Sequence, residues 1–287
     1  MKENLLKLQK IVAKTFRKAK HWYLAYVSWQ FIVLLFAVIS IFTELNPNLS
    51  AMIAFIGVLA AECIRWRSDW WKSEGERAKR KWEITDGFGT ALQGKDIADW
   101  LAARSRNFLN DVADNEIRGS LFDSVQSEGP RRAIENTQES AWWSSHLSRR
   151  MVIYLVLLLI FVLIVAFAAL TVSIGTLKAA NVQQSGATVH HVGGIICAVL
   201  VFVFSINVVR LLADFWGFKT ESSDILRRCD ELLKMSEISV RDAMCVLHDY
   251  QTARNAAPLL PTFVWKRHGN HLREQWEHFR PKQINEG

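Results

Sequence analysis

The sequence contains little proline, and charge is missing from four long stretches. Only five of its 287 residues are proline, so helices can run far without interruption. No Asp, Glu, Lys or Arg occurs in residues 21–43, 45–61, 151–177 or 179–209. A helix needs about 20 mostly apolar residues to cross a bilayer, because each residue adds about 1.5 Å. These gaps exclude an ordinary soluble enzyme and indicate a polytopic membrane protein.

Catalytic and metal-binding motifs are also missing. The four cysteines form no CxxC pair, and there is no glycine-rich phosphate loop or GxSxG motif, so nothing predicts a disulfide framework or a cofactor. His268 and His271 could share a helix face, but Gly269 and Asn270 weaken that helix and no third ligand has a fixed spacing. We therefore expect that the protein has no metal site, binds no cofactor and is not an enzyme.

Four apolar segments can be drawn as transmembrane helices, at residues 25–42, 49–64, 151–174 and 192–212. The turn Asn46-Pro47-Asn48 separates the first two, and a longer polar loop separates the last two. The predicted fold is an all-α membrane protein with two transmembrane helical hairpins. A helical cytoplasmic domain would be built from the central segment and the C-terminal tail.

Basic residues flank the apolar segments on one side only. Residues 1–20 hold seven basic groups and one acidic group, which supplies most of the net charge of +7. The positive-inside rule then places both termini and the central segment in the cytoplasm. Because the excess charge is concentrated in this tail, we expect a membrane-surface role for it and no DNA or RNA partner. The resulting divisions are a basic N-terminus at 1–20, hairpins at 21–64 and 151–212, and cytoplasmic segments at 65–150 and 213–287.

Tryptophans gather next to the cytoplasmic ends of the apolar segments. An indole prefers the headgroup level of a bilayer, so an interfacial belt is expected. The alternative is packing within the cytoplasmic helices. The residues concerned are Trp22, Trp66, Trp70, Trp71, Trp142, Trp143 and Trp216.

Periodic apolar residues predict further helices in the cytoplasmic part. The second span should continue as a helix as far as Arg80, with a break at residues 87–89. Later helices are expected over 97–112, over 139–150 leading into the third span, from a start at 220–224, around 240–251, and around 265–279, with a break at 256–261.

Two polar residues in the apolar segments are candidates for a pore or gate. Glu62 is the one carboxylate inside such a segment, and ionisable groups there are functional candidates by default. It also lies one turn from Arg65, so local pairing is the alternative. Asn207 could line a pore or join helices through hydrogen bonds. Four helices enclose no wide lumen, so a pore would need a homo-oligomer.

Arginines and a tyrosine form a candidate site for a phosphorylated ligand. Residues 129–132 (Gly-Pro-Arg-Arg) predict a turn that presents Arg131 and Arg132, and guanidinium groups suit phosphates. Tyr250, Arg254 and Arg267 could add stacking and charge. The alternatives for the arginine pair are a lipid headgroup contact or a salt bridge. His190 and His191 are simple interfacial residues or a pH sensor.

Two motifs stand out in the sequence, one before the third span and one in the tail. They read Gly129-Pro130-Arg131-Arg132…Glu135-Asn136…Glu139-Ser140-Ala141-Trp142-Trp143-Ser144…Leu147 and Asp249-Tyr250-Gln251…Arg254…Ala257-Pro258-Leu259-Leu260-Pro261…Trp265-Lys266-Arg267-His268…Leu272…Trp276. Together with the layout, these motifs resemble the bacterial SMODS-associated four-transmembrane proteins, predicted pore-forming effectors of anti-phage systems.

This resemblance implies a membrane effector of the bacterial inner membrane. A neighbouring nucleotidyltransferase would make a cyclic oligonucleotide on infection, and that ligand would trigger a breach of the membrane. The family offers no agreed catalytic residues to transfer. The alternatives are a non-toxic scaffold that recruits a cytoplasmic partner and a constitutive channel. Transporters commonly have paired broken helices, which we do not see here.

Overall fold

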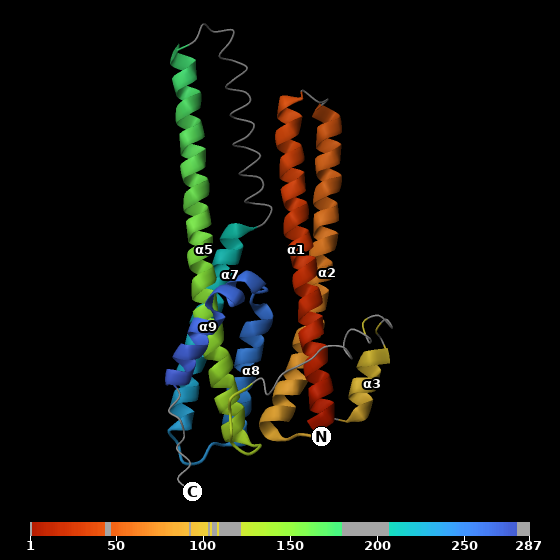
Figure 1. Ribbon diagram of the computed structural model, residues 1–287, viewed down its shortest axis with the longest axis vertical. Coiled ribbons are helices and arrows are strands. Elements are labelled where there is room, and N and C mark those ends of the chain that lie inside the picture. The colour runs from red at the N-terminus through yellow and green to blue at the C-terminus, as the bar shows by residue number, and fades with distance from the viewer. Residues whose placement is uncertain are drawn as a thin grey trace. The chain divides into compact units, whose positions relative to one another are not determined.

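The computed structural model describes residues 2–43, 47–91, 93–102, 104, 108, 122–179 and 207–279. Throughout these residues the regular elements are α-helices, with no strand. They are α1 (Lys2–Phe42), α2 (Pro47–Phe88), α3 (Gly94–Ala102), α5 (Pro130–Ala179), α7 (Val208–Leu233), α8 (Val240–Ala256) and α9 (Thr262–Phe279) (Figure 1).

The chain divides into two compact units. Unit 1 comprises Met1–Lys20, Trp71–Met151 and Asp214–Gly287, and unit 2 comprises His21–Trp70 and Val152–Ala213. Helices α1, α2, α5 and α7 each contribute residues to both units. Whether unit 1 is cytoplasmic stays a prediction.

Unit 2 contains the apolar parts of the long helices. Three described helices, α1, α2 and α5, are long and apolar enough to cross a membrane. Leu24, Phe55 and Phe161 are 63–64 % exposed, which suits contact with lipid. Over the residues that the structure describes, the protein is therefore all-helical, with membrane-length apolar helices. The predicted fourth span falls mostly outside the described residues, so four spans and their pairing into hairpins stay predictions.

Helices α1 and α2 pack closely within unit 2. The indole Nε1 of Trp29 donates a hydrogen bond of 2.8 Å to the carbonyl of Gly57. A methyl group at Gly57 would lie 2.8 Å from Cγ2 of Val33, so the absence of a side chain permits this approach.

The core of unit 1 joins α5, α7 and α8. Its centre contains small and medium apolar side chains that repeat at helical spacing on each helix. The buried members are Ile134, Ala141, Ile225, Cys229, Ala243, Val246, Tyr250 and Ala253.

The end of α2 fits tightly against the start of α5. Gly89, with φ of +69°, terminates α2 in the left-handed conformation that favours glycine, which confirms the break predicted at 87–89. A methyl group at Gly87 would lie 2.9 Å from Cβ and 3.1 Å from Cα of Ala133. The Gly129 amide also donates to the Gly87 carbonyl at 2.7 Å.

Helix α7 runs through the position where a new helix was predicted to start. The sequence Thr220–Asp224 looked like an N-cap because hydroxyls and carboxylates are favoured there. Instead, Thr220 and Ser223 donate hydrogen bonds to the carbonyls of Trp216 (3.1 Å) and Lys219 (2.9 Å). This back-bonding satisfies the hydroxyls inside a continuous helix, so the predicted start is wrong.

Other boundaries agree with the sequence or shift. Helices α8 and α9 confirm the two C-terminal helices and the break between them. Helix α5 begins at Pro130, earlier than predicted, because proline suits the first helical position. Arg131 and Arg132 therefore lie in a helical turn and not in a loop. Of the helix predicted over 97–112, α3 covers residues up to Ala102, and most of the remainder lies outside the described residues.

The prediction of an interfacial position is wrong for two of the tryptophans. Trp71 and Trp142 are each 6 % exposed within unit 1. Trp71 stacks on Phe108 with ring centroids 5.7 Å apart, and Trp142 packs on Trp276 at 5.2 Å. Aromatic packing in the core explains their burial. Trp66 and Trp216, at 71 % and 58 % exposed, retain the membrane interpretation.

Candidate functional site

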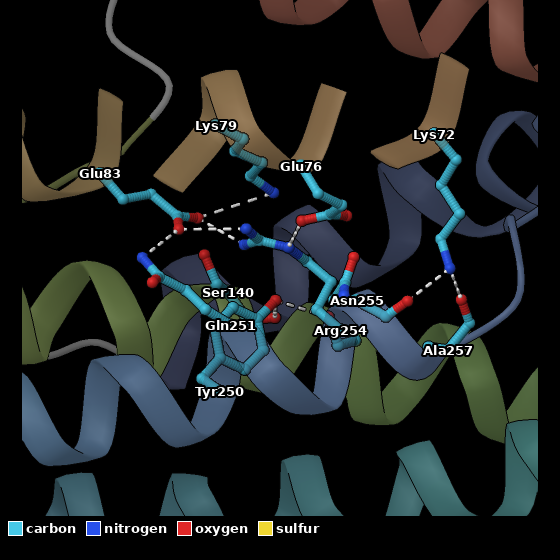
Figure 2. Close-up of polar contacts among 11 residues, drawn as sticks. Lys72, Glu76, Lys79, Glu83, Ser140, Tyr250, Gln251, Arg254, Asn255 and Ala257 are labelled. Atoms are coloured by element: carbon cyan, nitrogen blue, oxygen red, sulfur yellow. Dashed lines mark hydrogen bonds and ion pairs between the residues drawn. The ribbon is translucent and has the colours of Figure 1, made fainter. Parts of the chain in front are cut away.

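A buried cluster of charged side chains links α2 and α8 in unit 1 (Figure 2). Arg254 of α8 donates from Nε to Glu76 at 2.8 Å. It also donates from Nη1 and Nη2 to the two carboxylate oxygens of Glu83, at 2.5 and 3.1 Å. The three residues are at most 9 % exposed. A guanidinium between two carboxylates is a strong, directional arrangement.

Two more side chains complete the cluster. Gln251, one turn before Arg254, donates from Nε2 to Glu83 at 3.0 Å. The ammonium of Lys79 lies 3.8 Å from the same carboxylate. Two cations therefore face two carboxylates, and the cluster as a whole is neutral, which reduces the cost of burying it.

The cluster sets the protonation of its members. Burial by itself would raise the pKa of Glu83, but the charges of Arg254 and Lys79 and the hydrogen bonds outweigh it, so this pKa lies below its usual value. Burial would lower the pKa of Arg254, but Glu83 and Glu76 raise it well above the usual range. Both groups are thus held in their charged forms.

Tyr250 connects α8 to α5. Its hydroxyl donates to the carbonyl of Ser140 at 3.1 Å and lies 2.9 Å from the Ser144 hydroxyl. Burial raises the pKa of Tyr250, which keeps the phenol neutral. The Arg254 guanidinium lies 5.2 Å from the centre of the Tyr250 ring, so a cation–π contact supports it.

Lys72 secures the C-terminal end of α8. Its ammonium donates to the carbonyls of Asn255 at 2.7 Å and Ala257 at 2.5 Å (Figure 2). These carbonyls lie where a helix leaves acceptors unsatisfied and where its dipole favours a cation. Lys72, Glu76, Lys79 and Glu83 follow one another at i, i+4, i+7 and i+11, so α2 presents a single charged stripe to α8.

A cavity of ≈ 360 Å³ lies beside this cluster within unit 1. Lys72, Glu76, Lys79, Tyr250 and Arg254 form part of its wall. The remaining wall is largely apolar and aromatic, with contributions from Leu147, Phe215, Phe218 and the pair Trp143 and Trp265, whose rings lie 4.8 Å apart. Its size falls at the lower end of the range for small-molecule sites, about 300–1,000 Å³.

The structure separates the arginines of the predicted phosphate site. Arg132 forms an ion pair with Asp86 at 3.0 Å, which confirms the salt-bridge interpretation for that residue. Arg131 donates to the carbonyls of Leu233 (3.1 Å) and Met235 (3.4 Å) at the end of α7. Tyr250 and Arg254 lie at the cavity, and Arg267 is on an exposed part of α9. The use of these residues in ligand binding stays a prediction.

The polar residues singled out as pore candidates both lie in unit 2. Glu62 pairs with Arg65 at 3.7 Å, and its side chain is 54 % exposed. Asn207, with φ of +54°, precedes the first residue of α7, and its carbonyl accepts from the Leu211 amide at 2.8 Å. Their roles in a pore stay predictions. His190 and His191 lie outside the described residues.

Sequence reasoning missed Glu76, Lys79, Glu83 and Gln251. The stripe at 72, 76, 79 and 83 was visible as alternating lysine and glutamate at helical spacing. Its partners on α8 lie more than 160 positions away, so no local pattern joins them. Among the described residues, no group of three or more His, Cys, Asp or Glu side chains could hold a metal ion.

Comparisons with known proteins identify no relative. The chain matches no protein-family model, no curated protein and no solved structure.

Proposed function

We propose that this protein is a membrane effector of a bacterial anti-phage signalling system. On sensing a nucleotide second messenger or another cytoplasmic signal, it forms a pore or disrupts the inner membrane. It acts without catalysing a reaction, as a homo-oligomer, with both termini in the cytoplasm. The two motifs that resemble the SMODS-associated four-transmembrane proteins suggest the biological setting.

The observation that carries this proposal is the continuity of the long helices. Helices α1, α2 and α5 each combine a charge-free apolar stretch with residues of unit 1. Helices are stiff, so a change of packing in unit 1 reaches the apolar stretch of the same helix without an intervening loop.

The charged cluster offers a defined element for such a change. Arg254 and Gln251 hold α8 against the stripe on α2. A ligand that favours a different packing of α8 must bind that state more tightly, because only differential affinity shifts a conformational equilibrium. Arg131, in the first turn of α5, donates to carbonyls at the end of α7 and is the cytoplasmic residue that we propose for phosphate contact.

Pore formation requires several copies of the chain. Four helices are too few to enclose a wide lumen, so one chain alone cannot form the pore. We propose that copies associate through unit 2, with Glu62 and Asn207 placed where polar side chains would line or seal the path. Polar groups in apolar helices are favoured where they face one another or water.

A scaffold is the second candidate function. Met235, Val240 and Met244, between the end of α7 and the first turns of α8, are 52 %, 59 % and 37 % exposed. An exposed apolar group of this kind favours contact with a protein partner. In that case partner binding would occur with no change in membrane conductance.

The proposal can be tested in bacterial cells that carry a membrane-potential dye. The protein is co-expressed with an enzyme that produces cyclic oligonucleotides, and depolarisation is expected only when both are present. Arg131→Ala should blunt the response to the nucleotide, whereas the exposed Arg227→Ala, whose side chain is 68 % exposed, should not. Cells that stay polarised at full induction of both proteins would overturn the proposal. Purification of the protein from those cells together with a bound partner would favour the scaffold.

A further inference from the structure

The wall of the unit 1 cavity carries more positive than negative charge. Its basic side chains are Lys20, Lys72, Lys79 and Arg254, and its acidic ones are Glu76 and Glu139. Glu83 neutralises Arg254 and Lys79 together with Glu76. With Glu83 included, four cations stand against three carboxylates, so one positive charge is in excess.

Lys20 is the cation that the wall leaves uncompensated. Lys72 is engaged with two carbonyls, and the cluster neutralises Lys79 and Arg254. Lys20 forms no hydrogen bond or ion pair within the described ranges, and burial alone lowers its pKa. A partly buried ammonium without a counter-charge is unfavourable, and an anion in the cavity would remove that cost.

The rest of the cavity suits a hydrocarbon. Leu147, Phe215, Phe218 and Leu259 contribute apolar surface. Ser148, which is 2 % exposed, adds a polar side chain to the same wall. The wall thus combines one cation that has no carboxylate partner with a buried serine and apolar side chains, which matches one anionic head on an apolar body.

The geometry points to a binding site for a single-chain fatty acid anion in this cavity, with its carboxylate on Lys20 and its chain between the aromatic side chains. A nucleotide fits the wall less well, because its several phosphate oxygens need guanidinium donors. Nε, Nη1 and Nη2 of Arg254 already bind Glu76 and Glu83. The cavity volume of ≈ 360 Å³ suits one acyl chain better than a two-chain lipid.

The sequence positions of the wall residues agree with a ligand that comes from a bilayer. Lys20 directly precedes the charge-free stretch 21–43, and Ser148 lies three residues before the stretch 151–177. This inference goes beyond the proposed function and does not depend on it, since occupation of the cavity is measurable without any pore opening.

The test is photolabelling of the full chain in phosphatidylcholine nanodiscs with a palmitate that carries a diazirine on its chain. After irradiation, mass spectrometry maps the labelled peptides. We expect labels in residues 140–148 and 257–265, and we expect excess palmitate to remove them. Lys20→Met should reduce this labelling about tenfold, because it removes the charge-assisted hydrogen bond to the carboxylate. Lys20→Arg, which keeps the charge, should restore it.

Lys7→Met is the matched control, because Lys7 lies on the same helix, is 54 % exposed and pairs with Glu3 at 2.7 Å. It should label like the unmodified chain. Labels confined to residues 25–42, 49–64 and 151–174 would overturn the site, as would competition by a cyclic dinucleotide and not by palmitate. Nanodiscs that contain phosphatidylglycerol test the single-chain assignment: retention of the label there supports the free acid, and loss of the label would overturn it in favour of a two-chain anionic lipid.

Discussion

Arg254 on α8 donates two hydrogen bonds to the carboxylate of Glu83 on α2, from Nη1 to Oε1 at 2.5 Å and from Nη2 to Oε2 at 3.1 Å. The two residues are 171 positions apart in the chain, and both are buried. Because each nitrogen meets a different oxygen, the pair fixes the rotation of α8 as well as its distance from α2.

Removing one partner of this pair should strongly destabilise unit 1. Arg254→Ala leaves Glu76 and Glu83 buried without their main counter-charge, and breaking a buried pair costs about 3–5 kcal/mol. Urea unfolding of the detergent-solubilised protein, followed by pulse proteolysis, measures the loss. Arg227→Ala removes an exposed ion pair to Glu231, which typically contributes about 0.2–1 kcal/mol. Equal losses in the two variants would show that the buried contacts of Arg254 do not stabilise unit 1 more than a surface ion pair does.

Acid should weaken unit 1 through Glu83. The pKa of Glu83 is lower in the folded chain than its ordinary value of 4.5, so below pH 4.5 the unfolded chain binds a proton that the folded chain does not. The contribution of Glu83 to stability is therefore complete above pH 4.5 and decreases as the pH falls towards the folded pKa. The unfolding free energy should decrease as the pH falls from 7 to 3, and Glu83→Gln should reduce the slope of this decrease. An unchanged slope in Glu83→Gln would exclude Glu83 as its source.

Two glycines should respond oppositely to alanine. Gly87→Ala places a methyl group 2.9 Å from Cβ of Ala133 and 3.1 Å from its Cα, and such overpacking costs about 1–3 kcal/mol. Gly217, inside α7, has no atom within 4 Å of the same added methyl group, so Gly217→Ala should stabilise by about 0.5–1 kcal/mol through helix propensity. Thermal unfolding by circular dichroism compares the two. A stabilising Gly87→Ala would show that α2 and α5 do not approach as described.

Two cysteines of unit 1 should differ in reactivity. Cys229 is fully buried in the core, and burial raises the pKa of its thiol to about 12, so little thiolate forms at neutral pH. Cys245 on α8 is exposed. Brief treatment with iodoacetamide at pH 8, followed by peptide mass spectrometry, should modify Cys245 and leave Cys229 intact until the protein is denatured. Rapid modification of Cys229 in the folded chain would mean that the α5–α7–α8 core is not closed.

The sequence predicted elements that depend on local chemistry. The break at Gly89 follows from its left-handed backbone, and α8 and α9 follow from apolar residues such as Leu247 and Leu272 at helical spacing. The helix start predicted at Thr220 was wrong because a threonine hydroxyl can either cap the start of a helix or bond to a carbonyl one turn earlier inside a helix. Local sequence does not distinguish these two uses. Trp71 and Trp142 were misplaced for a related reason: indole suits both a headgroup region and a protein core.

The site depended on contacts that no local pattern contains. Tyr250 and Arg254 were predicted as ligand residues from their type, and the structure places them at a cavity. Their partners Ser140, Glu76 and Glu83 are set by how α2, α5 and α8 pack in three dimensions. The partner of Arg132 was also hidden, because Asp86 lies on α2, 46 positions earlier.

The most direct test of the central claim uses purified protein in liposomes loaded with a fluorescent dye. A panel of cyclic di- and trinucleotides is added, with the oriented and folded state of the protein verified beforehand. A nucleotide-gated pore should release the dye with one nucleotide and not with the others. If folded protein is inserted in the liposomes and no nucleotide releases the dye, the result would contradict a nucleotide-gated pore and favour the scaffold.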